Sequence, residues 1–273
     1  MDLEALYDVP AWEWPEGTKE KLLALVQNRA APREDRDMAA ELLSDVSVMD
    51  DGVAEALLNI AADPDEDPSL RGTAAVALGS ALEYADVEGF DDPEEAPITE
   101  TTFQKIQQKF YELYHDPRTP TEVRRSVLEG SVRAPQAWHR DAVASAYASK
   151  DSDWKLTAVF AMRWIEGFDR EILEALQSRD PDILYQAVCA AGAWGISEAA
   201  PVLENILGAD EIDEDLLFAA IEAVATVMPE RAPDVLEPFR QMDDPDIVDA
   251  VEEALAMAKG ILSLEDDGNG AGR

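Results

Sequence analysis

A pattern of apolar and small residues at helical spacing recurs six times along the chain. Each copy has an apolar residue, a small apolar residue four positions later, and Ala or Gly seven positions later. Offsets of four and seven fall on one side of an α-helix, where small side chains let a second helix approach closely. The copies start at Leu70, Val123, Trp154, Ile183, Leu216 and Ile247, and their seventh-position partners are Ala77, Gly130, Ala161, Ala190, Ala223 and Ala254.

Apart from one longer gap, the starts recur about every 31 residues, a length that fits two short helices and their turns. Apolar-periodic segments at 103–114, 170–177 and 201–207 lie between the marked helices. Each unit therefore reads as a helical hairpin whose second helix carries the pattern. A degenerate hairpin at 18–46 precedes the first marked unit and brings the expected number to about seven.

Helix start signals support this division. Aspartate stands three positions before five of the six starts, at Asp67, Asp151, Asp180, Asp213 and Asp244. An aspartate at this position accepts hydrogen bonds from the first free amides of a helix, and its charge favours the positive end of the helix dipole. The unit at Val123 lacks this residue, and Thr121 is the predicted cap there.

The segments DPDILYQAVCAAG (180–192) and DPSLRGTAAVALG (67–79) resemble the second helix of HEAT-like repeats of the phycobilisome-lyase type. The resemblance covers residues 18–264 and implies an all-α, right-handed α-solenoid of about seven HEAT-like hairpins. Most members of this superfamily are binding scaffolds, and a few are lyases, hydroxylases or DNA glycosylases. Outside the repeats, we expect an N-terminal arm at 1–17, an acidic loop insertion near 84–100 and a disordered tail at 265–273.

The charge of the chain restricts its partners and its setting. Asp and Glu number 59 against 22 Lys and Arg, which gives a formal net charge of -37. Concentrated salt would screen this self-repulsion, and the acids are spread through every unit, so we interpret the chain as a cytoplasmic protein of a halophile. A surface selected for a basic partner is the alternative interpretation. Nucleic acid is disfavoured because its phosphates need clustered Lys and Arg, and no stretch is apolar enough for a membrane span.

Residues with catalytic chemistry are few. His115 and His139 are the two histidines, and neither belongs to a metal-binding pair; Cys189 is the single cysteine, which excludes a disulfide within the chain. Trp138, His139 and Arg140 follow Pro135 and are predicted to form a surface cluster at a turn. We expect no catalytic residue, no metal and no cofactor.

The candidate site lies on the helix face that points away from the small-residue stripe. Offsets two, six and nine of the second helices place unexpectedly apolar side chains on this face, with arginines at one end. Such a patch is typical of a contact surface that would line the concave groove of a solenoid. The predicted partner-binding residues are Arg125, Leu156, Phe160, Arg163, Tyr185, Cys189 and Phe218.

Two explanations of this apolar face remain open. It binds a protein or peptide segment, with Phe160, Tyr185 and Phe218 as anchors, or it is buried within the monomer by tight curvature or by the arm that carries Trp12 and Trp14. We therefore predict a non-enzymatic scaffold or adaptor. The alternative is a HEAT-like lyase or related enzyme that holds a small molecule in the same groove, and the choice between a monomer and a homodimer is open.

Overall fold

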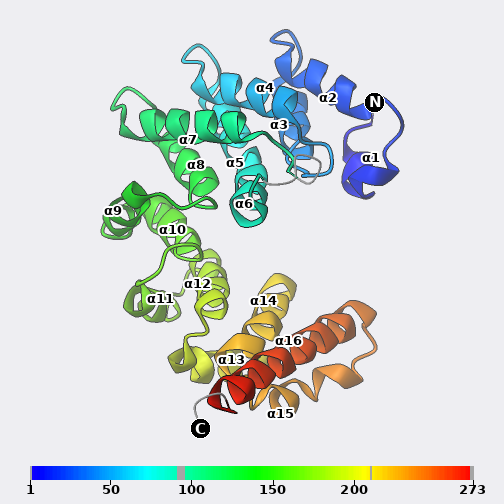
Figure 1. Ribbon diagram of the computed structural model, residues 1–273, viewed down its shortest axis with the longest axis vertical. Helices are drawn as coiled ribbons and strands as arrows, with labels where there is room; N and C mark the ends of the chain where they lie inside the picture. The colour runs from blue at the N-terminus through cyan, green and yellow to red at the C-terminus, as the bar shows by residue number, and fades with distance from the viewer. Residues whose placement is uncertain (1, 91–95, 210, 271–273) are drawn as a thin grey trace. The chain divides into compact units, whose positions relative to one another are not determined.

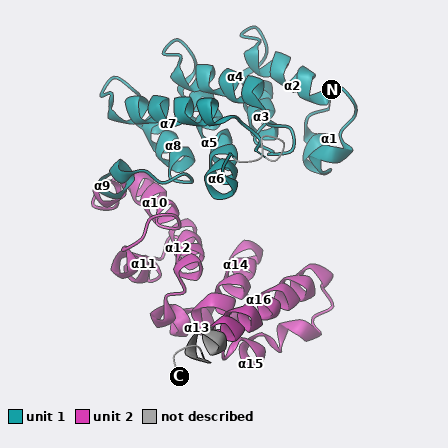
Figure 2. Ribbon diagram, viewed as in Figure 1, with its two compact units in different colours: residues 1–142 teal, residues 143–273 magenta. Residues whose placement is uncertain are grey.

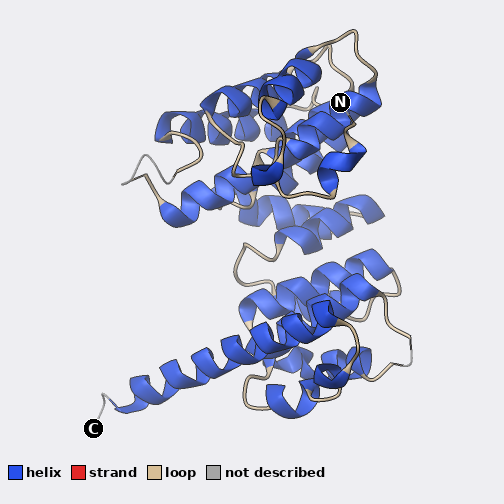
Figure 3. Cartoon of the chain, turned by 90° about the vertical axis from the view of Figure 1, so that its right-hand side faces the viewer, coloured by secondary structure: helices blue, strands red, loops and turns tan. Residues whose placement is uncertain are grey.

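The computed structural model of the protein describes residues 2–90, 96–209 and 211–270, with side chains up to residue 264. Every regular element in these ranges is a helix, and Figures 1 and 3 show no strand there. The chain forms two compact units, residues 1–142 and 143–273, and the division falls inside α9 (Ala137–Tyr147) (Figure 2). The predicted all-α class is confirmed.

The first unit contains three complete hairpins, in each of which two successive helices pack against each other. The second helices of these hairpins also pack in series, α3 against α5 and α5 against α8. A further helix, α6, follows α5. The elements are α1 (Glu4–Tyr7), η1 (Ala11–Glu13), α2 (Thr18–Gln27), α3 (Arg33–Leu42), α4 (Asp51–Ala62), α5 (Pro68–Ala77), α6 (Gly79–Glu88), α7 (Glu100–His115) and α8 (Thr121–Ser131).

The second unit repeats this arrangement. Its second helices pack in the order α10, α12, α14 and α16, each against the next. The pairs α11–α12, α13–α14 and α15–α16 bring the packed hairpins in the described ranges to six, and α9 and α10 take the place of a seventh pair without packing to the same extent; about seven hairpins were predicted. The elements are α10 (Ser152–Ala161), α11 (Asp169–Ala175), α12 (Pro181–Trp194), η2 (Ser197–Ala199), α13 (Ala200–Leu207), α14 (Glu214–Val227), α15 (Ala232–Leu236), η3 (Phe239–Gln241) and α16 (Pro245–Gly270).

The small-residue stripe is buried where the second helices meet. Ala161 and Ala190 are fully buried, and Ala223 is 2% exposed. A Cβ atom added to Gly130 would lie 2.3 Å from the carbonyl oxygen of Ala75, and one added to Gly192 would lie 3.0 Å from Ala223 Cα. The backbones therefore approach so closely that only the smallest side chains fit, as the pattern predicted.

The helix start signals act as predicted in five helices. The carboxylates of Asp67, Asp151, Asp180, Asp213 and Asp244 each accept a hydrogen bond from an amide of the first turn. The prediction for the sixth helix was wrong. Thr121 is the first residue of α8 and Pro120 occupies the cap position, with no side-chain hydrogen bond. The fixed φ of proline starts this helix without a capping side chain.

Side chains from neighbouring elements also bind carbonyls at helix C-termini. In the first unit, the Nε atoms of Arg36 and Arg71 donate to the carbonyl oxygens of Val26 and Ala61, in the last turns of α2 and α4. In the second unit, Thr226 Oγ1 donates to the carbonyl oxygen of Gly192 at the end of α12. The carbonyl of Gly192 also accepts the backbone N–H of Gly195, so the threonine adds a second bond there. All three side-chain bonds connect successive helices.

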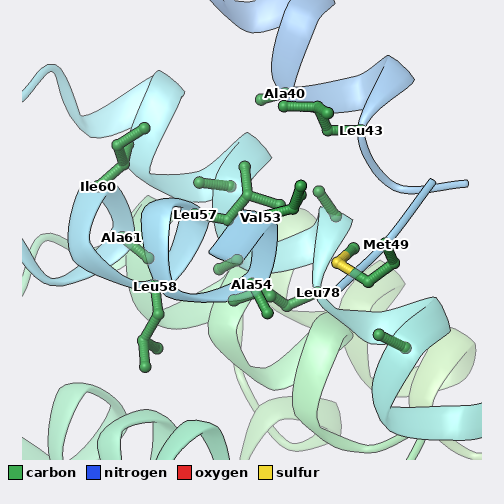
Figure 4. Packing of buried hydrophobic residues seen from close by; sticks show 14 of the residues in the cluster. Ala40, Leu43, Met49, Val53, Ala54, Leu57, Leu58, Ile60, Ala61 and Leu78 are labelled. Atoms are coloured by element: carbon green, nitrogen blue, oxygen red, sulfur yellow. The ribbon is translucent and has the colours of Figure 1, made fainter. Parts of the chain in front are cut away.

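The core of the first unit is continuous from the arm to the third hairpin. Figure 4 shows part of it, where Val53, Ala54 and Leu57 of α4 pack with Leu43 and Leu78 from neighbouring segments. All five of these side chains are fully buried, and the neighbouring Met49 is 6% exposed. No helix in the described residues has the length and hydropathy that crossing a bilayer requires.

The segments outside the repeats differ in part from the predictions. The arm packs on the first unit through Leu3 and Leu6, whereas Trp12 is 77% exposed. The predicted loop near 84–100 is shorter, because α6 continues to Glu88 and α7 begins at Glu100; residues 91–95 lie outside the described ranges. Helix α16 continues to Gly270 through most of the predicted disordered tail, since extending a formed helix costs little.

His139 is fully buried, so the predicted surface cluster at Trp138–Arg140 is only partly correct. The backbone N–H of Gln136 donates to Nδ1, and Nε2 lies 2.9 Å from Ser131 Oγ. Nδ1 is therefore the unprotonated nitrogen, and Nε2 donates to the serine. Burial lowers the pKa of His139 to about 3 and keeps the ring neutral.

Alanine substitution at two glycines tests the close helix contact. Gly130→Ala forces the backbone of α5 away from α8 and should cost about 1–3 kcal/mol of folding free energy. Gly260→Ala is the matched control, because a Cβ there meets nothing within 4 Å, and it should gain about 0.4–1 kcal/mol. Calorimetric unfolding in molar KCl measures both changes, and equal effects of the two substitutions would contradict the contact.

Acid should destabilise the first unit through His139. The folded-state pKa lies below the unfolded value, so the stability is present above about pH 6.5 and falls as the pH drops towards 3. Between pH 6.5 and 5, above the range of most carboxylates, this one group should remove about 1.5 kcal/mol. Denaturant titrations of wild type and His139→Asn should differ in their pH slope over that range, and parallel slopes would contradict the neutral buried ring.

Candidate functional site

Six of the seven predicted site residues lie in the second unit, on or next to the second helices. Leu156 and Phe160 belong to α10, Tyr185 and Cys189 to α12, and Phe218 to α14; all five are half-buried. They are neither solvated like a polar helix face nor enclosed like the core. We call Leu156, Phe160, Tyr185 and Phe218 the aromatic face.

Arg125 does not belong to this group. It lies on α8 in the first unit, where it lines a separate hollow of about 400 Å³. That hollow lies between α3, α5 and α8, and its lining includes Gly72 and Val76 at the outward offsets of α5. The recurring sequence pattern gives the position of each residue around its helix. It does not reveal where the series of helices divides into two compact units.

Arg163 is exposed beside the aromatic face, although it is not helical as the offset rule assumed. Helix α10 ends at Ala161, and the backbone N–H of Arg163 donates to the carbonyl oxygen of Phe160 in a tightened last turn. The guanidinium lies 5.6 Å from the ring centroid of Trp164. The Trp164 ring in turn lies 4.8 Å from that of Phe160. The arginine is therefore held next to the aromatic side chains of Trp164 and Phe160.

A hollow of about 200 Å³ lies beside these residues and joins α12, α14 and α16. Arg163 and Glu222 supply its charged groups, and small residues of the helix contact supply most of the remaining lining. Sequence analysis missed Met257, which is 48% exposed, because its offset of ten was not assigned to the outward face. The lining residues are Arg163, Cys189, Gly192, Ala193, Ala219, Glu222, Ala223, Thr226 and Met257.

Trp194, the last residue of α12, contacts the preceding repeat. Its indole Nε1 donates to the carbonyl oxygen of Met162, just after α10, at 2.7 Å. The ring is 36% exposed, so it connects two repeats without being part of the core. The repeat length in the sequence predicts that Trp194 lies one repeat after Met162, but it does not predict the hydrogen bond between them.

The thiol of Cys189 is held in its neutral form. Burial is the largest influence and raises its pKa, while Arg163 and a hydrogen bond from Tyr185 lower it and Glu222 raises it. The neighbouring thiol, followed by burial, raises the pKa of the Tyr185 hydroxyl. A neutral thiol is a poor nucleophile, so this arrangement does not activate Cys189 for covalent chemistry. The described residues contain no group of three or more His, Cys, Asp or Glu placed to hold a metal ion.

Residues 170–256, from α11 into α16, match the HEAT repeats family. Over these residues the chain is a HEAT-like repeat protein. No curated protein matches this HEAT-like chain at a significant level.

Solved structures with a related arrangement of helices include three named proteins. YibA of Escherichia coli is 17% identical with a TM-score of 0.44, over 90% of this chain and 83% of that one. Human deoxyhypusine hydroxylase in complex with glycerol is 15% identical with a TM-score of 0.40, over 89% and 96%. The complex of CpcE and CpcF of phycocyanin lyase from Nostoc sp. PCC7120 is 17% identical with a TM-score of 0.46, over 92% and 98%. At these values, none of the activities in these names is transferred to this HEAT-like protein.

Alkylation of the single cysteine reports directly on the hollow. Because burial outweighs the effect of Arg163, the pKa of Cys189 is raised. The pH at which the rate of reaction with iodoacetamide reaches half its maximum should therefore lie above the pKa of an ordinary thiol, about 8.5. Arg163→Gln should move that midpoint further up, since it removes the cation that favours the thiolate. The matched control Arg179→Gln, which takes an exposed charge from the same unit, should leave the midpoint unchanged. A wild-type midpoint at or below that of the urea-unfolded chain would contradict this assignment.

Proposed function

We propose that this HEAT-like protein is a non-enzymatic scaffold whose aromatic face binds a protein segment. The observation that carries the proposal is the partial exposure of four large apolar side chains on consecutive second helices, in a chain in which 30% of the residues are charged. Leaving such side chains partly in water costs free energy that a partner recovers on binding. Aromatic residues are also the commonest anchors of protein interfaces.

The size and lining of the adjacent hollow support a scaffold over an enzyme. Small-molecule sites usually enclose about 300–1,000 Å³ and bring several polar groups together. The hollow beside Cys189 measures about 200 Å³ and is lined mainly by Gly, Ala, Met and Thr. This space accommodates a single side chain of a bound segment, and the aromatic face next to it provides the area for the rest.

The packing of the N-terminal arm weighs against the alternative explanation that the arm buries the aromatic face. Trp14 packs against the core of the first unit, and its indole Nε1 donates to the carbonyl oxygens of Leu6 and Val9. Its ring is thus occupied within the first unit. Within the monomer, the aromatic face is therefore half-buried by neighbouring helices and not by Trp14.

Serine substitution at two anchors tests the proposal. A library of phage-displayed random dodecapeptides, selected in molar KCl, should yield apolar and aromatic peptides on the wild-type protein. Phe160→Ser with Tyr185→Ser should reduce binding of these peptides at least about tenfold, since buried aromatic anchors contribute 2 kcal/mol or more. Because both side chains are only half-buried, the double variant should lose less than about 3 kcal/mol of stability.

The matched control is Tyr111→Ser, which removes a 43% exposed tyrosine from the first unit and should not affect peptide binding. Equal peptide enrichment on wild type and on the double variant would contradict the proposed function. Unfolding of the double variant under the selection conditions would instead show that the face is part of the monomer core.

A further inference from the structure

Arg163 differs from several other arginines of the chain, which contact carboxylates. Arg133, Arg231 and Arg240 each contact a glutamate carboxylate. Within the described residues, no carboxylate lies within 4 Å of Arg163, and its contact is with the face of the Trp164 ring. In a chain with 59 acidic residues against 22 basic ones, this guanidinium retains its capacity to bind an anion.

The surroundings of Arg163 hold it ready for such a contact. Stacking on Trp164, which itself packs on Phe160, places the cation at the border between the aromatic face and the hollow. A guanidinium offers a planar set of N–H donors that matches the two oxygens of a carboxylate. Because the stacked position is already formed, binding costs less side-chain entropy than it would for a freely moving arginine.

Glu222 lines the same hollow and would oppose an anion, so the two charges have to be compared. At the sulfur of Cys189, on the wall of the hollow, Arg163 lowers the pKa more than Glu222 raises it. Lowering the pKa of a thiol means stabilising negative charge at that position. At this sulfur, Arg163 therefore has a larger effect than Glu222.

We propose that the protein segment bound by the aromatic face carries an aspartate or glutamate whose side-chain carboxylate pairs with Arg163 at the mouth of the hollow. This inference rests on the proposed function, because the aromatic face supplies the apolar contact and Arg163 supplies the specificity. The hollow of about 200 Å³ has room for one acidic side chain. The segment is thus apolar with an acidic residue next to its anchors, in spite of the overall negative charge of this HEAT-like protein.

The phage-displayed dodecapeptides described above test this directly, because each displayed peptide has its C-terminus joined to the coat protein. Peptides enriched on the wild-type protein should carry Asp or Glu beside an aromatic or aliphatic residue. On Arg163→Gln the acidic preference should disappear while the apolar preference remains. Arg179→Gln is the matched control and should select the same peptides as wild type.

One enriched peptide, synthesised with an acetylated N-terminus and an amidated C-terminus, then separates a side-chain carboxylate from a terminal one. Its affinity should fall about tenfold on Arg163→Gln and about tenfold when its acidic residue is changed to the amide. The two changes together should cost no more than either alone, since they remove the same contact. Additive losses, or selected peptides that are apolar but neutral or basic, would overturn the inference while leaving the proposed function intact. Failure to enrich any peptide over the Phe160→Ser/Tyr185→Ser variant would instead overturn the proposed function.

Discussion

The structure depends on the close approach of successive second helices through their smallest side chains. Where α12 meets α14, Gly192 and Ala223 lie so near that a single added methyl group would be in tight contact with the opposing backbone. Where α5 meets α8, Gly130 has no room for any side chain. Dispersion forces act over short distances, so this close contact provides strong attraction for each residue buried. It also fixes the rotation of these second helices about their own axes.

That fixed rotation determines the surface available for function. With the small residues turned inward, Phe160, Tyr185 and Phe218 are directed to the other side of their helices, where they are half-buried. Arg163 comes to the edge of this face because α10 ends at Ala161 and the chain turns. The combination of partly exposed apolar side chains and one oriented cation, on which the proposed function rests, follows from helix rotation and helix length together.

The repeat pattern in the sequence was sufficient to predict most of the fold. Ala161, Ala190 and Ala223 occupy the helix contacts assigned to them, and the caps at Asp180 and Asp213 form as predicted. These features depend on local spacing, which is visible in a single sequence. The period also predicted the succession of helix pairs, six of which pack as hairpins in the described residues.

The candidate site was less predictable because it depends on contacts between residues far apart in the sequence. The offset rule found Phe160 and Tyr185 on the outward face, but it treated Arg163 as helical and missed Met257. It could not show that Arg125 belongs to a different compact unit. His139 illustrates the same limit, since its burial depends on packing and on Ser131 at the end of the preceding helix.

Nuclear Overhauser spectroscopy of a selectively labelled protein tests the central contact most directly. Protons on Gly192 Cα and the methyl group of Ala223 are expected to show a strong cross-peak, because a Cβ at Gly192 would lie 3.0 Å from the Ala223 Cβ. The absence of that cross-peak, together with broadening of the Ala223 methyl signal by a soluble paramagnetic probe, would contradict the helix contact and the placement of the aromatic face derived from it.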